Sequence, residues 1–150
     1  MAGERMTSTE IWLRLIHTGS LCGDAMLDAV ARLQNQKSID VPVLRNAGLT
    51  AKQAERFFAP DENELERSLM WLEQPDNQLL TAHDPLYPPL LRTIPDYPGA
   101  LFVKGNPEAL NTIQLAVVGS RAPSWYGERW GKILCEQLSQ SGFTITSGLA

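Results

Sequence analysis

The feature that most constrains the fold is a strand–turn–helix–strand pattern in the last third of the chain. An uninterrupted apolar run at residues 115–118 leads directly into Gly119, and residues 143–146 have a second strand pattern. Between them, residues 124–142 have the apolar spacing of one helix, which begins at a serine cap and ends at a glycine. This is a βαβ unit with parallel strands and a right-handed crossover. We expect its first strand to be buried on both faces of a parallel sheet.

The first half of the chain has a different pattern, that of short helices joined by tight turns. Apolar side chains recur three and four residues apart, and Thr50 and Gln53 have the spacing of a capping box. We therefore expect a compact all-α domain at residues 1–75. Its helical stripes, and that of the later helix, predict three core tryptophans, which are Trp12, Trp71 and Trp130.

Five prolines fall between residues 84 and 98, at the start of a second domain that we place at residues 76–150. Proline fixes φ and removes an N–H donor, so this stretch predicts an ordered loop without regular structure. A short apolar strand at residues 101–103 follows it. The apolar side chains of the loop are expected to pack down, and they are Leu86, Tyr87, Leu90, Leu91 and Ile94.

Composition and charge narrow the possible classes of protein. Hydrophobic residues make up 43% and charged residues 20%, as in a soluble globular chain, and the short apolar runs predict no membrane segment. The first residues lack the apolar core of a secretory signal, which favours the cytoplasm. Residues 1–76 hold 12 acidic and 8 basic side chains, whereas residues 77–150 hold 5 of each. Contacts with phosphate must therefore be local, and the second half is the better place for them.

The candidate site lies where the first strand of the βαβ unit meets its helix. Gly119, Ser120 and Arg121 follow the strand, and ligands of open α/β sheets bind at that edge. The helix N-terminus and an arginine fork both suit phosphate. The next strand delivers Ser147 and Gly148 to the same edge. Taken alone, the pattern fits either an anion site or a tight turn with a solvated arginine.

Several further motifs resemble those of a known family. From residue 83 onward, the chain resembles the core of the DNA-processing protein A (DprA/Smf) family in order and spacing. The matching segments are Tyr87-Pro88, Leu90-Leu91, residues 101–105 (Leu-Phe-Val-Lys-Gly), residues 116–121 (Ala-Val-Val-Gly-Ser-Arg), Tyr126-Gly127 and residues 147–150 (Ser-Gly-Leu-Ala).

The resemblance implies a small helical domain of the sterile-alpha-motif (SAM) or helix-hairpin-helix type, followed by a Rossmann-like parallel-sheet domain. It also implies sequence-independent binding of single-stranded DNA and delivery to a RecA-type recombinase in recombination, or in DNA uptake during competence and transformation. Arg121 would contact phosphate, and Gly119, Ser120, Ser147 and Gly148 would shape the pocket. The full-length parent would be a homodimer. We expect the Rossmann-like domain to be truncated here, because the family segment continues past Ala150.

Several alternatives remain open at this stage. Trp125 is a candidate for base stacking, and residues 46–54 fit either a phosphate-binding hairpin or a packing turn. The sequence shows no nucleophile–base pair, Walker motif or metal-ligand spacing, so we expect no catalytic residue, metal or cofactor. The rival functions are a Rossmann-like nucleotide-binding hydrolase or transferase, which uses the same edge, and a helical protein-interaction module.

Overall fold

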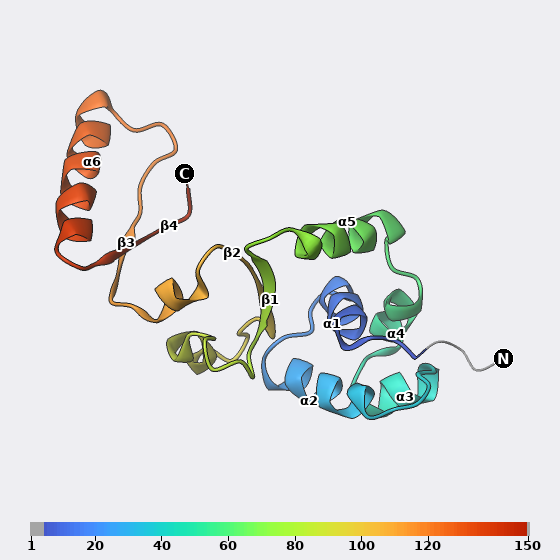
Figure 1. The fold of residues 1–150 in the computed structure, drawn as a ribbon. Coiled ribbons are helices and arrows are strands. Elements are labelled where there is room, and N and C mark those ends of the chain that lie inside the picture. The colour runs from blue at the N-terminus through green and yellow to red at the C-terminus, as the bar shows by residue number, and fades with distance from the viewer. Residues whose placement is uncertain (1–4, 150) are drawn as a thin grey trace. The chain divides into compact units, whose positions relative to one another are not determined.

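The computed structural model describes residues 5–149. The chain divides into two compact units, Met1–Asn106 and Pro107–Ala150. We call them the helical unit and the α/β unit, and each is described by itself. Figure 1 shows the helices and strands of both.

Five helices form most of the helical unit. The first of them, α1, lies inside the bundle and packs against α2, α4 and α5 (Figure 1). Ile11, Trp12, Leu13 and Leu15 of α1 are each at most 4% exposed, so apolar contacts surround this helix on most sides. The predicted all-α bundle is confirmed. Its helices are α1 (Ser8–His17), α2 (Gly23–Gln34), α3 (Val41–Asn46), α4 (Ala51–Phe58) and α5 (Glu62–Glu73).

Several helices begin at residues whose side chains cap the first turn. Thr50 Oγ1 accepts from the Gln53 amide at 3.1 Å, and the Gln53 side chain accepts from the Thr50 amide at 2.9 Å. This reciprocal pair is the predicted capping box. Asp40 caps α3 through a single hydrogen bond of 2.9 Å, which its side chain accepts from the Val43 amide. Such caps satisfy amides that the first helical turn leaves without partners.

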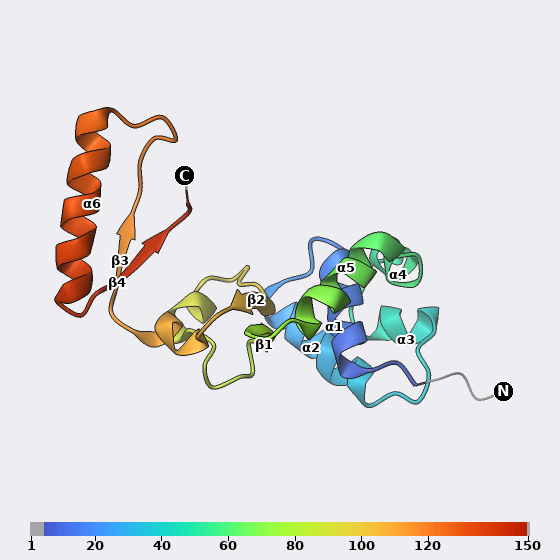
Figure 2. The same ribbon diagram turned by 45° about the horizontal axis from the view of Figure 1, so that its top comes forward.

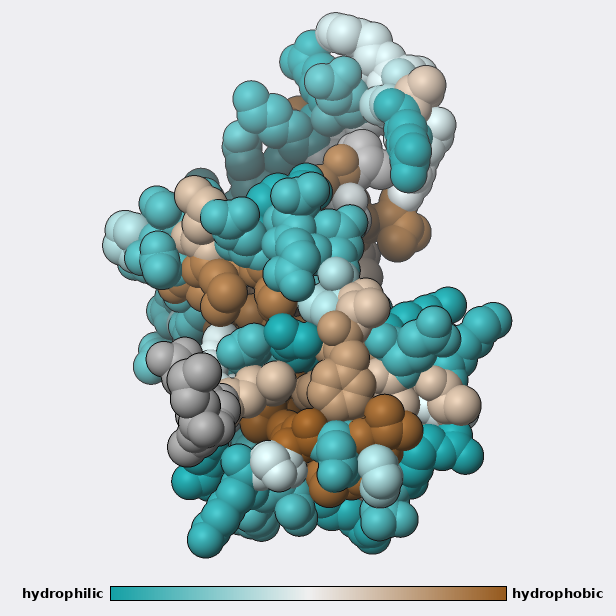
Figure 3. Space-filling view, turned by 90° about the vertical axis from the view of Figure 1, so that its right-hand side faces the viewer, coloured by the Kyte–Doolittle hydropathy of each residue, from teal (hydrophilic) through white to brown (hydrophobic). Residues whose placement is uncertain are grey.

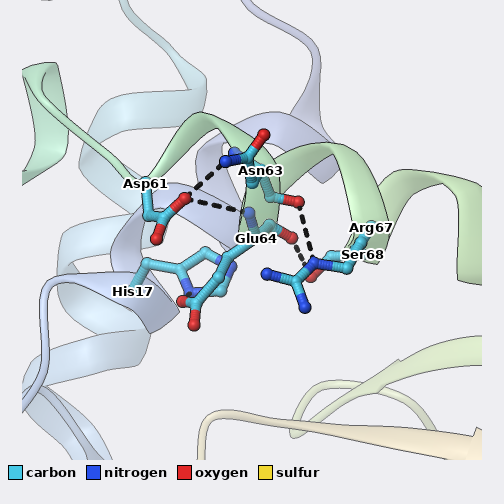
Figure 4. Close-up of polar contacts among 6 residues, drawn as sticks. All are labelled: His17, Asp61, Asn63, Glu64, Arg67 and Ser68. Atoms are coloured by element: carbon cyan, nitrogen blue, oxygen red, sulfur yellow. Dashed lines mark hydrogen bonds and ion pairs between the residues drawn. The ribbon is translucent and has the colours of Figure 1, made fainter.

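Acidic side chains at the start of α5 cap the helix and contact α1 (Figure 4). Asp61 Oδ1 accepts from the amides of Asn63 and Glu64, at 3.0 and 3.2 Å. The Glu64 carboxylate lies 3.7 Å from His17 Nδ1 at the end of α1, where α1 and α5 are in contact. This cluster therefore has a structural role in helix capping and packing.

A two-stranded antiparallel hairpin follows the bundle and belongs to the helical unit. Strand β1 (Asn77–Thr81) pairs with β2 (Ala100–Lys104), and Asn77 lies opposite Lys104. The Gly105 amide donates to the Asp76 carbonyl at 2.8 Å, which closes the base of the hairpin. The rings of Trp71 and Phe102 meet edge to face at 5.7 Å, so α5 packs on this sheet. The tryptophan at position 71 is only half-buried.

The proline-rich segment between the strands, residues 84–98, is ordered, and we call it the strap. Contrary to expectation, it contains a short 3₁₀ helix, η1 (Pro89–Thr93). Tyr87 is 3% exposed and packs down as predicted, whereas Leu90 and Ile94 are 83% and 44% exposed; Tyr97, for which no prediction was made, is also 3% exposed. The two tyrosines anchor the strap because their rings supply its largest buried surfaces, and the tight η1 turn directs Leu90 outward.

The strap is fixed to the start of α2 by backbone and side-chain contacts. Tyr97 donates its hydroxyl hydrogen to Asp24 Oδ1 at 2.7 Å, and the Gly23 amide donates to the Tyr97 carbonyl at 2.7 Å. Gly23 has φ +59°, and a Cβ at this position would lie 2.3 Å from the Pro95 carbonyl oxygen. Only glycine combines this backbone conformation with so close an approach.

These contacts explain where the compact unit ends. The helices end at Glu73, close to the domain boundary that the sequence suggests after residue 75. The hairpin and the strap nevertheless pack with the helices, through buried residues such as Leu80, Tyr87 and Tyr97, and the helical unit extends to Asn106. The helical part thus folds together with about thirty residues of the segment that follows it.

Burial and the hydrogen bond to Asp24 raise the pKa of Tyr97 above its ordinary value of about 10. A raised pKa in the folded state means that stability is fully present below pH 10 and is lost as the pH rises beyond it. We expect Tyr97→Phe to flatten the alkaline limb of the stability curve, measured by urea unfolding between about pH 8 and 11. An unchanged alkaline limb would contradict this role.

The α/β unit contains the predicted βαβ arrangement. Strands β3 (Gln114–Val117) and β4 (Thr144–Ser147) are parallel, and α6 (Trp125–Gln140) connects them (Figure 2). Before β3 comes a short 3₁₀ helix, η2 (Pro107–Asn111). Ser124 caps α6 as expected, with its Oγ accepting from the Gly127 amide at 3.1 Å. The overall class, a helical domain followed by a small mixed α/β domain, is as predicted.

Burial in the α/β unit is lower than the sequence predicts. Leu115 of β3 is 38% exposed. On α6, the expected core residue Trp130 is 54% exposed and Tyr126 is 65% exposed. The expectation of a strand buried on both faces is therefore wrong for the described residues. Within residues 107–149, the sheet has two strands and α6 is the α-helix that packs on it, so most apolar side chains have nothing to cover them.

Figure 3 shows one face of the molecule, on which apolar residues lie between hydrophilic ones. Val41 and Phe58 are among the exposed large apolar residues of the helical unit, at 52% and 43%. Within residues 5–149, no helix combines the length and the apolar character that a membrane span needs.

Candidate nucleic-acid interface

The residues that the sequence singles out lie on two neighbouring loops of the α/β unit. Val117 and Ser147 are paired in the parallel register of β3 and β4. The loop at residues 118–124 therefore leaves the sheet beside the end of β4 (Figure 2). The structure thus brings Gly119, Ser120 and Arg121 to the same sheet edge as Ser147 and Gly148. We call these five residues the edge loops.

The two serines of the edge loops have matching local geometry. Ser120 Oγ accepts from the Ala122 amide at 3.1 Å, and Ser147 Oγ accepts from the Leu149 amide at 3.1 Å. Each hydroxyl uses an acceptor site to shape its own loop. Because a hydroxyl has one donor and two acceptor sites, its hydrogen can still donate to an anion. Both loops are thereby held in shape and keep a donor at the surface.

Arg121 is exposed, and it makes no hydrogen bond or ion pair with any other described residue. Its guanidinium therefore has all its donors available for a phosphate or carboxylate. The N-terminal end of α6 begins four residues later and adds its partial positive charge. The electrostatics of this edge suit an anion.

The glycines of the edge loops have no packing requirement within the α/β unit. A Cβ at Gly119 or at Gly148 would meet no atom within 4 Å, and neither residue has a positive φ. Neither backbone strain nor crowding from the described residues thus explains these glycines. A missing side chain leaves the backbone amides open to close approach by a ligand.

The structure also shows a residue that sequence reasoning missed. Arg129 Cζ lies 5.5 Å from the centre of the Trp125 ring, and that ring is 73% exposed. The i, i+4 spacing of the two residues on a helix is a signal that would have revealed the pair. The candidate stacking residue Trp125 thus carries a cation beside its face.

The hairpin at residues 46–54 is less suited to phosphate. The amides of Ala47, Gly48 and Leu49 donate to carbonyls of α3, at 3.0 to 3.1 Å, and the Thr50 amide is held by the capping box. Amides with internal partners are unavailable to a ligand. This favours the packing-turn interpretation of the segment.

No group of three or more His, Cys, Asp or Glu side chains within the described residues is placed to hold a metal ion. Cys22 and Cys135 are both free, half-buried thiols.

Two family models match successive parts of the chain. Residues 6–70 match the SMF/DprA SAM domain, and residues 78–150 match the DNA recombination-mediator protein A domain. The gap between the matches lies at the end of α5 and the start of β1.

Similar proteins come from several bacteria. The chain is 54% identical to protein Smf of Escherichia coli over 145 residues, which are 97% of this chain and 39% of that protein. It is 25% identical to the DNA processing protein DprA of Bacillus subtilis over 97% of this chain and 50% of that protein. The crystal structure of DprA from Streptococcus pneumoniae matches with a TM-score of 0.65 and 29% identity, over 97% of this chain and 50% of that one.

The chain therefore spans half or less of the length of these relatives. Both family models, the relatives and the solved structure agree over almost all of it. The chain belongs to the DprA/Smf family of DNA recombination-mediator proteins.

Proposed function

We propose that this chain binds single-stranded DNA without sequence preference, through phosphate contacts at the edge loops. The observation that carries the proposal is the unpartnered guanidinium of Arg121 at a sheet edge that also presents two serine hydroxyls and two open glycines. The match of residues 78–150 to a recombination-mediator domain supports DNA as the anion in this proposal.

The wider role that we propose follows from the family. The parent protein would work in the cytoplasm as a homodimer and deliver bound single strands to a RecA-type recombinase, in recombination or in DNA uptake. Delivery needs binding and release and no bond chemistry, so the site would need no catalytic residue. A recombinase-loading assay, with and without the chain, tests this step separately from binding.

We expect Arg121→Ala to weaken binding of a fluorescent oligothymidine about 10–150-fold, because a hydrogen-bonded charge contact contributes about 1.5–3 kcal/mol. Removing one phosphate contact should also reduce the slope of log K against log salt by about 0.7. Fluorescence anisotropy at about 50 and 200 mM salt measures both quantities.

Arg67→Ala is the matched control, because it removes the same charge from an exposed position on α5 of the other unit. Equal losses in the two variants would mean that Arg121 acts only through net charge. Displacement of the oligothymidine by micromolar mononucleotide would instead favour the nucleotide-binding enzyme, and no binding of either ligand would favour the interaction module.

A further inference from the structure

The first three turns of α6 carry an exposed groove of about 330 Å³, lined by Trp125, Tyr126, Arg129, Trp130 and Ile133. We call it the aromatic groove. Trp125, Tyr126 and Trp130 are 73%, 65% and 54% exposed. The rings of Trp125 and Tyr126 on the first turn of α6 and of Trp130 on the second form a surface suited to flat ligands.

The rings are arranged for stacking and are accompanied by positive charge. Tyr126 and Trp130 meet edge to face at 6.1 Å, and the Arg129 guanidinium lies 5.5 Å from the Trp125 ring centre. Residues 107–150 hold three basic side chains, Arg121, Arg129 and Lys132, and all three lie within the edge loops and the first two turns of α6. Glu128 is the acidic residue in the same stretch, so its net charge is positive in a chain of net charge −4.

We propose that the aromatic groove receives the unpaired bases of single-stranded DNA whose phosphates contact the edge loops. This inference rests on the proposed function and adds to it the contacts that distinguish single-stranded from double-stranded DNA. Phosphate contacts alone would not distinguish the two, because single strands and duplexes share the same sugar-phosphate backbone. Bases in a duplex are already stacked on one another, whereas an unpaired base can stack on an aromatic ring, and every base has a face for this.

The charge beside the groove favours bases over an apolar protein segment as its occupant. A second groove on α6, of about 220 Å³, is lined by Trp130, Gly131, Ile133, Leu134 and Gln137 and has no charged side chain. A partner helix or a second copy of the chain would fit that groove better. Leu134 is 57% exposed and lines the second groove without lining the aromatic groove, which makes it the control position.

The test compares three oligonucleotides of equal length, which are oligothymidine, a fully abasic deoxyribose-phosphate strand, and a duplex. We expect Trp125→Ala to weaken oligothymidine binding about 5–150-fold, as for the loss of one stacked base. Binding of the abasic strand and the salt slope should change less than about twofold, because the phosphate contacts remain. The preference for single strand over duplex should fall with the oligothymidine affinity. Leu134→Ala should alter none of these values.

The outcomes separate this inference from the function on which it rests. If Arg121→Ala weakens binding of both single strands and Trp125→Ala weakens neither, the edge loops hold phosphate and the stacking inference is wrong. The inference would also be overturned if Trp125→Ala weakened binding of the oligothymidine and of the abasic strand equally, because the ring would then act on the phosphate site. A wild-type chain that binds neither strand would overturn the proposed function as well. A second copy in the groove would appear in sedimentation as a dimer that Trp125→Ala dissociates, which would contradict occupation by bases.

Discussion

Phe57→Ala is expected to lower the free energy of unfolding of the helical unit by about 3–5 kcal/mol, the usual cost of removing a buried phenyl ring. The Phe57 side chain is fully buried, and its ring meets Phe58 edge to face at 5.5 Å. The Arg14 guanidinium lies 5.8 Å from the ring centre and also donates to the Phe57 carbonyl at 2.8 Å. Alanine would remove the ring from contacts with both neighbours and leave a cavity beside α1.

Hydrogen exchange of α1 amides during urea unfolding measures this loss in the helical unit alone. Phe58→Ala is the control, because it removes the same ring from the next position, which is 43% exposed. We expect that control to cost about 1 kcal/mol. If the two substitutions cost the same, burial of Phe57 does not contribute as the structure implies.

Gly23→Ala is expected to destabilise the helical unit by about 2–5 kcal/mol, since it combines backbone strain with overpacking. The added Cβ would lie 2.3 Å from the Pro95 carbonyl oxygen, so the strap or the start of α2 must move. Either movement would disturb the 2.7 Å hydrogen bond from the Gly23 amide to the Tyr97 carbonyl. Exchange protection should fall first in the strap and at the start of α2.

Gly48→Ala separates the two causes. Gly48 also has a positive φ, of +102°, but a Cβ there would meet nothing within 4 Å. It should therefore show the backbone cost of about 1–2 kcal/mol alone. The two variants would have equal stability only if the approach of Pro95 to Gly23 contributed nothing.

Most local features of the fold follow from the sequence because they depend on neighbouring residues. The capping box at Thr50 and Gln53 and the cap at Ser124 are formed as predicted. The two edge loops also come together as expected, because the parallel strands of a βαβ unit end at one edge.

The features that the sequence did not reveal depend on distant partners. Strand β1 has only two adjacent apolar residues in Asn77–Thr81, and its partner β2 lies about twenty residues further on. Alternating polarity therefore gives no signal for it, and the strand is fixed by pairing. Trp130 is exposed because few elements surround α6. It does lie on an apolar stripe of the helix, as the sequence predicts. The pairing of Arg129 with Trp125 is an exception, because it is local and its i, i+4 spacing is present in the sequence.

The hydrogen bond from Gly105 to Asp76 has a consequence for how sequences of this kind can vary in length. It closes the hairpin at its base, so the chain leaves the hairpin and strap, residues 77–104, close to the point at which it enters them. Residues added between the two tyrosine anchors would bulge outward at the exposed Leu90, without shifting α5 or the residue that follows Gly105. The fold should therefore tolerate added residues in this stretch, which makes it a convenient place for inserting an epitope or a fluorescent label.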